Sequence, residues 1–358
     1  GADTILFWCW RDEVFGRESC GFGLSGLDGL AEERLRAMAH TGALIRKHAD
    51  LIDNYQPCRP TVGLLFSPQA YYLNWAAEGN ASRAWNALGG YCRGLTRKSI
   101  PYTVIEEQHL DALDGLKVLF LPRTLVTDAK QEKAFKAFVE AGGTLVCESE
   151  CGAFNSAGLY RYPEDRFTAR MAGIKEIGRR QSADSVEAAL GGKTVSLDLA
   201  QWVTPWETGA GSAVASCDEG ALVAEVPVGK GRLILGGSYF GEAYAKKRGA
   251  GFEDYVEWAV GRADWHREVE IVSPAPTREA SLFVKYGTSG GKRMVFVFVD
   301  RGQDEATLRF CKGFFNARGA CDLISGATHN LTDGPEGKTE IRLWCPDWRF
   351  AVLVESHA

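Results

Sequence analysis

The sequence has no long apolar run and no excess of positive charge. No stretch approaches about 18 uninterrupted apolar residues, and the first residues lack the basic start, apolar run and small-residue cleavage site of a signal peptide. The formal net charge is -5 at pH 7, which gives no basic field for nucleic acid or for an anionic membrane. We therefore expect no membrane span, no export signal and no nucleic-acid partner.

Motifs that hold metals or cofactors are also lacking. The ten cysteines are scattered, without a CxxC pair and without the histidine spacing of a zinc site. The stretch from Gly229 to Gly231 lacks the other residues of a phosphate-binding P-loop, and a hairpin turn explains it better. We predict no metal and no cofactor. Mostly reduced, buried cysteines are expected, which favours a cytoplasmic location.

The sequence does contain enough apolar material for more than one core. With 358 residues, 45% of them hydrophobic and 24% charged, it has the composition of an ordinary globular protein of two or three domains.

The opening stretch TILFWCWR is apolar without interruption from Ile5 to Trp10, which is typical of a strand covered on both faces. A helix is predicted over residues 31–52. Its expected apolar face consists of Leu35, Met38, Ala39, Gly42 and Ile45.

From residue 61 short apolar strands alternate with helices. Strands are predicted at TVGLLFS, YTVIEE, KVLFLP and GTLVCES. Asp128 and Gln131 have the spacing of a capping box at the start of one intervening helix. The expected buried face of another, at 81–99, consists of Trp85, Leu88, Cys92 and Leu95. This alternation predicts an α/β fold with a parallel, doubly wound sheet.

The second half of the chain indicates antiparallel structure. The stretch ALVAEVPVGKGRLILGGSYF predicts a hairpin that turns at Gly229 to Gly231, and a helix is predicted over 251–264. From about residue 266, alternating runs are separated by Gly, Asn and Asp turns. This tail predicts a small antiparallel β-sandwich.

One stretch invites a catalytic interpretation. VCESECGAFN places Ser149 and Cys151 just after a strand of the doubly wound region, where a nucleophile elbow would lie. An elbow needs small residues on both sides of its nucleophile, whereas Glu148 and Glu150 flank this serine and only Gly152 fits. No histidine lies near in the sequence. We therefore favour a scaffold over a nucleophile here.

The opening stretch, GADTILFWCWR…FGRESCGFGL…GLDG, resembles the eighth strand and following loop of the catalytic barrel in glycoside hydrolase family 42, the β-galactosidases. The stretches VGLLFS, RKSIPYTVIEE, LKVLFLPRTLVTDAKQEKAFKAFVEAGGTLV and PVGKGRLILGG are similar to that family's trimerisation domain, and the tail to its C-terminal β-domain. The resemblance implies three parts. They are the last β/α unit of a (β/α)8 barrel (1–58), a flavodoxin-like, class I glutamine amidotransferase-like trimerisation domain (59–265) and the C-terminal β-sandwich (266–358).

The same resemblance implies a function. It implies part of a retaining β-galactosidase-like hydrolase that forms trimers and cleaves terminal β-galactosides or related glycosides with two glutamates. In the family both glutamates lie on earlier barrel strands, so we expect no catalytic residue in this chain and a missing barrel portion as its partner. Trp10 and Arg11 match the strand-end motif and Glu18 matches the loop glutamate. These three are the predicted binding residues for the carbohydrate substrate.

Two alternatives stay open. A non-catalytic carbohydrate-binding or assembly protein could have the same regions without ever having had a barrel. An amidotransferase-like thiol enzyme would use Cys147 or Cys151. Whether the chain belongs to an enzyme therefore depends on a barrel. Without one, the opening strand should expose the side chains of Ile5, Phe7, Trp8 and Trp10.

Overall fold

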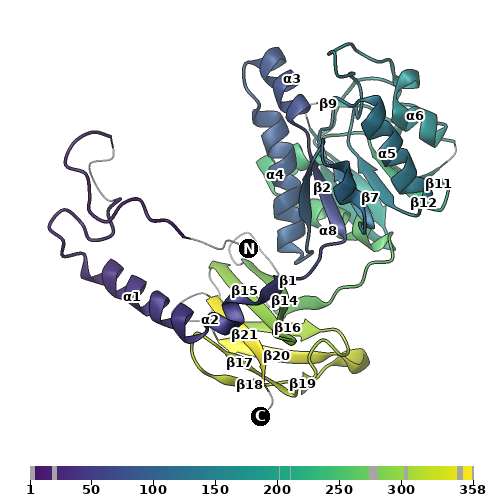
Figure 1. Cartoon of the computed structure of the whole chain (residues 1–358). Helices are drawn as coiled ribbons and strands as arrows, with labels where there is room; N and C mark the ends of the chain where they lie inside the picture. The colour runs from purple at the N-terminus through teal and green to yellow at the C-terminus, as the bar shows by residue number, and fades with distance from the viewer. Residues whose placement is uncertain are drawn as a thin grey trace. The chain divides into compact units, whose positions relative to one another are not determined.

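The computed structural model describes residues 5–17, 22–200, 202–209, 211–273, 281–301, 305–344 and 350–356 (Figure 1). Contacts between residues divide the chain into two compact units. One unit is Arg59–Glu268, and the other combines Gly1–Cys58 with Val269–Ala358. Each unit has a hydrophobic core of its own.

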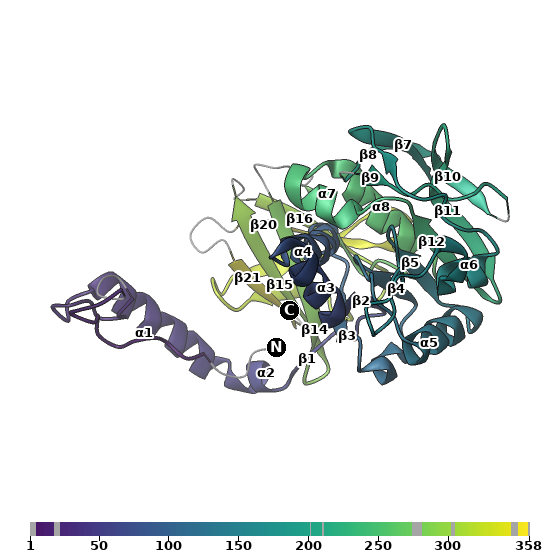
Figure 2. The same cartoon turned by 90° about the horizontal axis from the view of Figure 1, so that it is seen from above.

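A nine-stranded sheet forms the centre of the unit Arg59–Glu268 (Figure 2). In spatial order its strands are β3 (Thr103–Glu106), β2 (Val62–Phe66), β4 (Val118–Leu121), β5 (Thr144–Cys147), β12 (Gly231–Gly236), β11 (Gly220–Val228), β10 (Ser212–Cys217), β7 (Ser185–Leu190) and β8 (Lys193–Asp198). The first five are parallel and the other four continue the sheet antiparallel. A short pair, β6 (Arg180–Gln181) and β9 (Trp202–Val203), stands beside it.

Helices cover both faces of the parallel strands. They are α3 (Pro68–Glu78), α4 (Ser82–Arg97), α5 (Ala129–Glu140), α6 (Phe167–Ala172), α7 (Phe240–Lys247) and α8 (Ala250–Gly261), with single turns η1 (Leu110–Leu113) and η2 (Pro163–Asp165). One core cluster joins the sheet to α4, α7 and α8, and a second joins it to α5 and α6. Leu64 and Leu65, neighbours in β2, belong to different clusters, because successive side chains of a strand point to opposite faces. The α/β prediction is confirmed.

Two local predictions from the sequence are also confirmed. The Asp128 carboxylate accepts a hydrogen bond from the Gln131 backbone N–H at 2.8 Å, and the Gln131 side chain accepts one from the Asp128 backbone N–H at 2.9 Å. This capping box begins α5. The hairpin turns where expected, because Val228 of β11 pairs with Gly231 of β12.

The buried face of α4 differs from the expected one. Of the four predicted core residues, Leu95 is buried, Leu88 and Cys92 are partly buried and Trp85 is 65% exposed. The helix is instead turned so that its small residues meet α7. A Cβ atom on Gly90 would lie 2.1 Å from the carbonyl oxygen of Gly241. This close approach of two backbones sets the face, and the positions of large apolar residues alone do not reveal it.

Two antiparallel sheets form the second unit. The larger consists of β1 (Tyr55–Pro57), β14 (Ser281–Ser289), β15 (Lys292–Arg301), β21 (Phe350–Ser356), β17 (Gly319–Asp322) and β18 (Thr328–Asn330). The smaller consists of β13 (Val269–Ser273), β16 (Glu305–Phe310), β20 (Thr339–Trp344) and β19 (Thr332–Asp333), and a turn η3 (Pro335–Gly337) precedes β20. Side chains from both sheets share one core. The N-terminal segment belongs to this unit because β1 pairs with β14.

The predicted opening strand does not form among the described residues of this chain alone. Residues 5–17 contain no regular secondary structure, and Ile5, Trp8 and Trp10 are 68%, 66% and 68% exposed. A strand needs neighbouring strands that satisfy its backbone groups and cover its faces. No strand among the described residues pairs with this segment, and its carbonyl groups at Cys9 and Trp10 accept hydrogen bonds from the coil residues Leu24 and Ser25.

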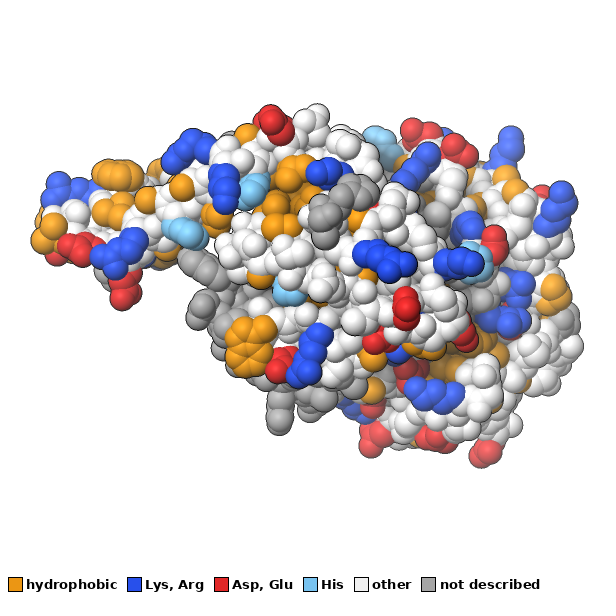
Figure 3. Space-filling view, turned by 90° about the horizontal axis from the view of Figure 1, so that it is seen from below, with side chains coloured by type: hydrophobic (Ala, Val, Ile, Leu, Met, Phe, Trp, Pro, Cys, Tyr) orange, Lys and Arg blue, Asp and Glu red, His pale blue; other side chains and the backbone are white. Residues whose placement is uncertain are grey.

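The predicted N-terminal helix forms, and its longer part stays uncovered. It consists of α1 (Glu32–Lys47) and α2 (Ala49–Asp53), and neither helix has a buried residue. Figure 3 shows hydrophobic side chains exposed along this segment, at the left of the view. Leu51 of α2 packs against a cluster of the larger sheet, whereas the apolar face expected on α1 is present without a partner among the described residues.

Candidate functional site

The structure places two of the three predicted substrate-binding residues in the N-terminal segment. Glu18 lies outside the described residues. The carbonyl oxygen of Trp10 accepts hydrogen bonds from the Ser25 backbone N–H at 2.8 Å and from the Ser25 hydroxyl at 2.7 Å. Arg11 Nε donates to the carbonyl oxygen of Leu27 at 2.9 Å. These contacts fix the backbone around Trp10 and Arg11, and the sugar site stays a prediction.

Polar side chains gather in the unit Arg59–Glu268, where the parallel strands end. Ser67 follows β2, Arg123 follows β4, Glu148 and Glu150 follow β5, and Tyr239 follows β12; all five are buried. The carboxyl ends of parallel strands meet at one edge of a sheet, which is the usual place for a site in an open α/β sheet. This edge is the candidate site.

Glu150 occupies the position expected for a nucleophile elbow. Its φ of 58° is in the left-handed region, shortly after β5 ends. Its carboxylate accepts hydrogen bonds from Arg179 at 2.9 and 3.1 Å, from Trp202 Nε1 at 3.4 Å and from the Tyr239 hydroxyl. Burial raises the pKa of Glu150, but the hydrogen bonds from Arg179 and Tyr239 outweigh burial and lower it overall. The residue at the elbow position is therefore an ionised carboxylate that accepts hydrogen bonds.

The Trp202 ring links this carboxylate to α4. The guanidinium groups of Arg83 and Arg179 each lie 4.4 Å from the ring centroid of Trp202. Arg83, which comes from α4, also pairs with Glu242 at 3.0 Å. We call Arg83, Glu150, Arg179, Trp202 and Tyr239 the edge network.

Glu148 joins the loop that follows β4 to the first turn of α7. Its two carboxylate oxygens accept hydrogen bonds from the backbone N–H groups of Arg123 and Gly241, both at 2.8 Å. Burial raises the pKa of Glu148 to about 7, because it penalises the charged form more than the two N–H groups stabilise it. The edge thus contains an acid that titrates near neutral pH.

The thiols of the amidotransferase-like alternative are not placed for catalysis. Cys147 and Cys151 are both buried. Burial raises the pKa of Cys151 well above its usual value, so this side chain remains a thiol. The Ser149 hydroxyl shares a hydrogen bond of 2.6 Å with the Thr204 hydroxyl. The geometry gives no support to a thiol or serine nucleophile.

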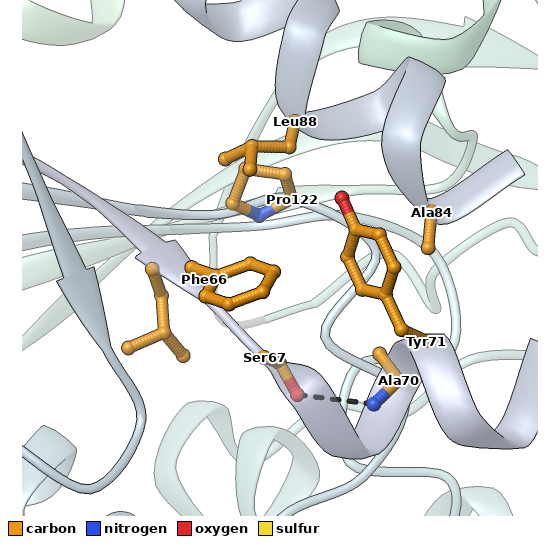
Figure 4. A pocket seen from close by; sticks show the side chains of 8 residues that line it. Phe66, Ser67, Ala70, Tyr71, Ala84, Leu88 and Pro122 are labelled. Atoms are coloured by element: carbon orange, nitrogen blue, oxygen red, sulfur yellow. Dashed lines mark hydrogen bonds between the residues drawn. The ribbon is translucent and has the colours of Figure 1, made fainter. Parts of the chain in front are cut away.

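A small cavity lies at the carboxyl end of β2, beside α3 (Figure 4). Ser67, Tyr71 and Pro122 line it, and its volume of about 10 Å³ has room for about one water molecule. Ser67 is fixed there because its hydroxyl caps α3 by accepting a hydrogen bond from the Ala70 N–H at 3.2 Å. The cavity is too small for a sugar.

Three other features were considered in the described residues: a second pocket, a metal site and a membrane-spanning helix. A wider hollow of about 290 Å³ adjoins Glu242 and Lys246, whose charged ends pair at 2.7 Å. Within the described ranges, no group of three or more His, Cys, Asp or Glu side chains is arranged to hold a metal ion. No helix in those ranges combines the length and the apolar character needed to cross a membrane.

Sequence reasoning considered Glu150 only as an obstacle to an elbow and missed its partners. Two acids directly after a buried strand were a usable signal, because a buried carboxylate needs donors. The donors themselves, Arg179, Trp202 and Tyr239, are 29, 52 and 89 residues further along the chain. No local pattern connects residues at such separations.

Comparison with known proteins gives one family and a group of similar folds. The model of the beta-galactosidase trimerisation domain matches residues 61–247. The beta-galactosidase BgaA of Clostridium cellulovorans is 23% identical over 155 residues, which are 43% of this chain and 23% of that protein.

Solved beta-galactosidases share the fold of the chain. A GH42 beta-galactosidase from G. stearothermophilus, solved as a catalytic mutant, gives a TM-score of 0.74 at 17% identity and covers 99% of this chain and 48% of that one. The enzyme from Bacillus circulans sp. alkalophilus gives a TM-score of 0.75 at 16% identity, with 99% and 50% covered. The chain therefore spans about half the length of these two structures.

Proposed function

Because the chain belongs to the beta-galactosidase trimerisation domain family, we propose that it provides the assembly part of a retaining, family 42-like glycoside hydrolase. The observation that carries this proposal is the match over residues 61–247, which cover most of the parallel-sheet unit and the whole edge network. Three copies would associate through this unit.

The order of the parallel strands supports a flavodoxin-like unit. The spatial order β3-β2-β4-β5-β12 is second, first, third, fourth and fifth along the chain, which is the order of flavodoxin-like sheets. A fold of this kind does not itself imply a chemistry. The unit would serve as a scaffold, because Glu150 and its donors occupy the place that a nucleophile would need.

Hydrolysis would take place in a (β/α)8 barrel that acts together with this chain. Residues 1–58 would form its last β/α unit, with Trp10, Arg11 and Glu18 beside the sugar. A retaining hydrolase uses two carboxyl groups about 5 Å apart, one as acid/base and one as nucleophile. Both would come from the rest of the barrel. The exposed side chain of Trp8 supports this arrangement, since a barrel would cover it.

The substrates would be terminal β-galactosides or related glycosides, and the location would be the cytoplasm. Within the described ranges, no cysteine is bridged to another by a disulfide. Unbridged cysteines suit a reducing compartment, because an oxidising one favours disulfides.

The proposal is tested by native and denaturing mass spectrometry together with an assay of aryl β-galactoside hydrolysis, all on one sample. We expect three 39.1 kDa chains in one complex without hydrolysis, and hydrolysis only where a second polypeptide of about 250 residues is present. A monomer would contradict the assembly role. Hydrolysis by the 39.1 kDa chain alone would contradict the absence of catalytic residues. Sugar binding with no barrel partner in the source organism would favour the non-catalytic alternative.

A further inference from the structure

Large hydrophobic side chains are exposed in two groups within residues 61–247. Among the described residues of that range, eight such side chains are exposed, and two of them, Val104 and Ile177, lie apart from the others in the sequence. The remaining six form a helical patch on α3 and α4 and a loop patch before η2. The helical patch is Tyr72, Trp75 and Trp85, and the loop patch is Leu159, Tyr160 and Tyr162.

The helical patch spans two helices, α3 and α4, that contact each other. Tyr72 and Trp75 are three residues apart on α3 and therefore share a face of that helix. Tyr71, one turn before Trp75, contacts the Trp85 ring of α4 edge-on, with 6.2 Å between the ring centroids. Trp75 and Trp85 are 64% and 65% exposed. Two exposed tryptophans on neighbouring helices, linked through Tyr71, are characteristic of a protein interface, where Trp is enriched.

The loop patch is held in place by its own contacts. The Tyr160 ring stands edge-on to Phe154 at 5.4 Å and to Tyr162 at 5.6 Å. The Tyr160 hydroxyl accepts a hydrogen bond from Arg166 at 2.9 Å. A fixed loop loses little conformational entropy on binding, which favours association.

The edge network fixes the two patches relative to each other. From α4 it runs through Arg83 and Trp202 to Glu150, whose backbone N–H donates to Glu176 at 2.8 Å. Glu176 in turn pairs with Arg166, the partner of Tyr160. Leu73 of α3 and Phe154 also pack against the same apolar cluster. Both patches therefore belong to one rigid edge of the sheet.

We propose that the helical patch of one copy packs against the loop patch of the next, so that three copies close into a ring. This inference rests on the proposed function, because the family is one of trimerisation domains. A three-fold ring is heterologous: each copy must offer two different surfaces, which meet only on neighbouring copies. The matched range offers two such apolar surfaces among its described residues, held on one edge.

The test uses the full chain and one double variant for each patch, measured by sedimentation velocity over a range of concentrations. Trp75→Ala with Trp85→Ala removes the helical patch, and Leu159→Ser with Tyr162→Ser removes the loop patch. Loss of a central interface tryptophan raises a dissociation constant about 30-fold or more. Each double variant alone should therefore sediment mainly as a monomer where the unaltered chain is a trimer.

Mixing the two double variants is the decisive step. Each retains the patch that the other has lost, so an equimolar mixture should form heterodimers with one intact contact and no closed ring. Trp344→Ala in β20, which removes a tryptophan that is 60% exposed in the other unit, and Val104→Ala in β3 are the matched controls and should stay trimeric. Unchanged circular dichroism shows that each variant folds.

The possible results separate the pairing of the two patches from the assembly role of the chain. Trimers of both double variants, or a mixture that stays monomeric, would overturn the pairing of these patches and leave the assembly role intact. An unaltered chain that does not trimerise would overturn both. If a soluble oligosaccharide bound the helical patch while the trimer persisted in its presence, the patch would be a sugar site, which also overturns the inference.

Discussion

The helices α1 and α4 have the same length of 16 residues and opposite environments. α4 buries six of its residues, among them Tyr91 and Leu95, whereas α1 buries none. Both have apolar residues spaced for one face. The difference shows that an apolar face predicts a helix that needs a packing partner, but does not show whether the chain supplies that partner. Packing against another element supplies most of the stability of a helix in a protein.

The surroundings of single glycines in α1 and α4 differ in the same way. An added Cβ on Gly90 of α4 would meet the backbone of Gly241 at 2.1 Å. On Gly42 of α1 it would meet the end of the Arg46 side chain at 3.4 Å, which can move aside. On Gly89 of α4 it would meet nothing within 4 Å. Glycine is therefore required at position 90, whereas positions 42 and 89 have room for a larger residue.

The largest expected effect is that of Gly90→Ala. The new methyl group must push α4 away from α7, which should lower the free energy of unfolding of the parallel-sheet unit by about 3 kcal/mol, the upper part of the usual range for overpacking. Urea denaturation measures it. Gly89→Ala and Gly42→Ala are the controls, and each should leave stability unchanged or raise it by up to about 1 kcal/mol, because Ala favours helix over Gly. Equal effects of Gly90→Ala and Gly42→Ala would remove the distinction between the two helices.

A smaller effect is expected from the buried carboxyl of Glu148. Below pH 4.5 this group is protonated in the folded and unfolded chain alike, and as the pH rises the unfolded chain ionises first. Its contribution to stability is therefore lost between about pH 4.5, the usual pKa, and about pH 7, the raised pKa. Glu148→Gln removes that loss, so the stability of the variant relative to the unaltered chain should rise by about 1 to 3 kcal/mol over this window.

The measurement is the free energy of unfolding at pH 4.5, 6 and 8. Glu32→Gln in α1 is the matched control, because its exposed pair with Arg36 at 3.5 Å contributes little to stability. A difference between Glu148→Gln and the unaltered chain that stays constant with pH would show that Glu148 ionises freely in the folded state.

The smallest effect on stability is expected from deleting residues 1–47. Because α1 buries no side chain, the free energies of unfolding of both units should change by less than about 0.5 kcal/mol. Self-association at high concentration, followed by light scattering, should decrease with the loss of the exposed Trp8 and its neighbours. Deleting residues 1–57 is the comparison, since it also removes β1 from the sheet edge beside β14. If the shorter deletion unfolded either unit, the first 47 residues would be part of a core.

Several elements of the fold could be predicted because their signals are local. The capping box of Asp128 and Gln131 and the turn at Gly229 to Gly231 depend on residues within a few positions of one another. The donors of Glu150 could not be predicted, because Tyr239 is 89 residues away in the sequence and is brought there by the pairing of β12 with β5. The substrate-binding assignment of Trp10, Arg11 and Glu18 came from resemblance alone and remains a prediction.

The sequence by itself determined the type of structure in two regions, since the alternation of strands and helices after residue 61 and of antiparallel strands after residue 266 follows from short-range periodicity. Only the tertiary structure decided that α4 turns Trp85 outward, that Glu150 is an ionised acceptor and that Ile5 to Trp10 form no strand. Burial and pairing depend on neighbours that are distant in the chain, and periodicity contains no information about which neighbours those are.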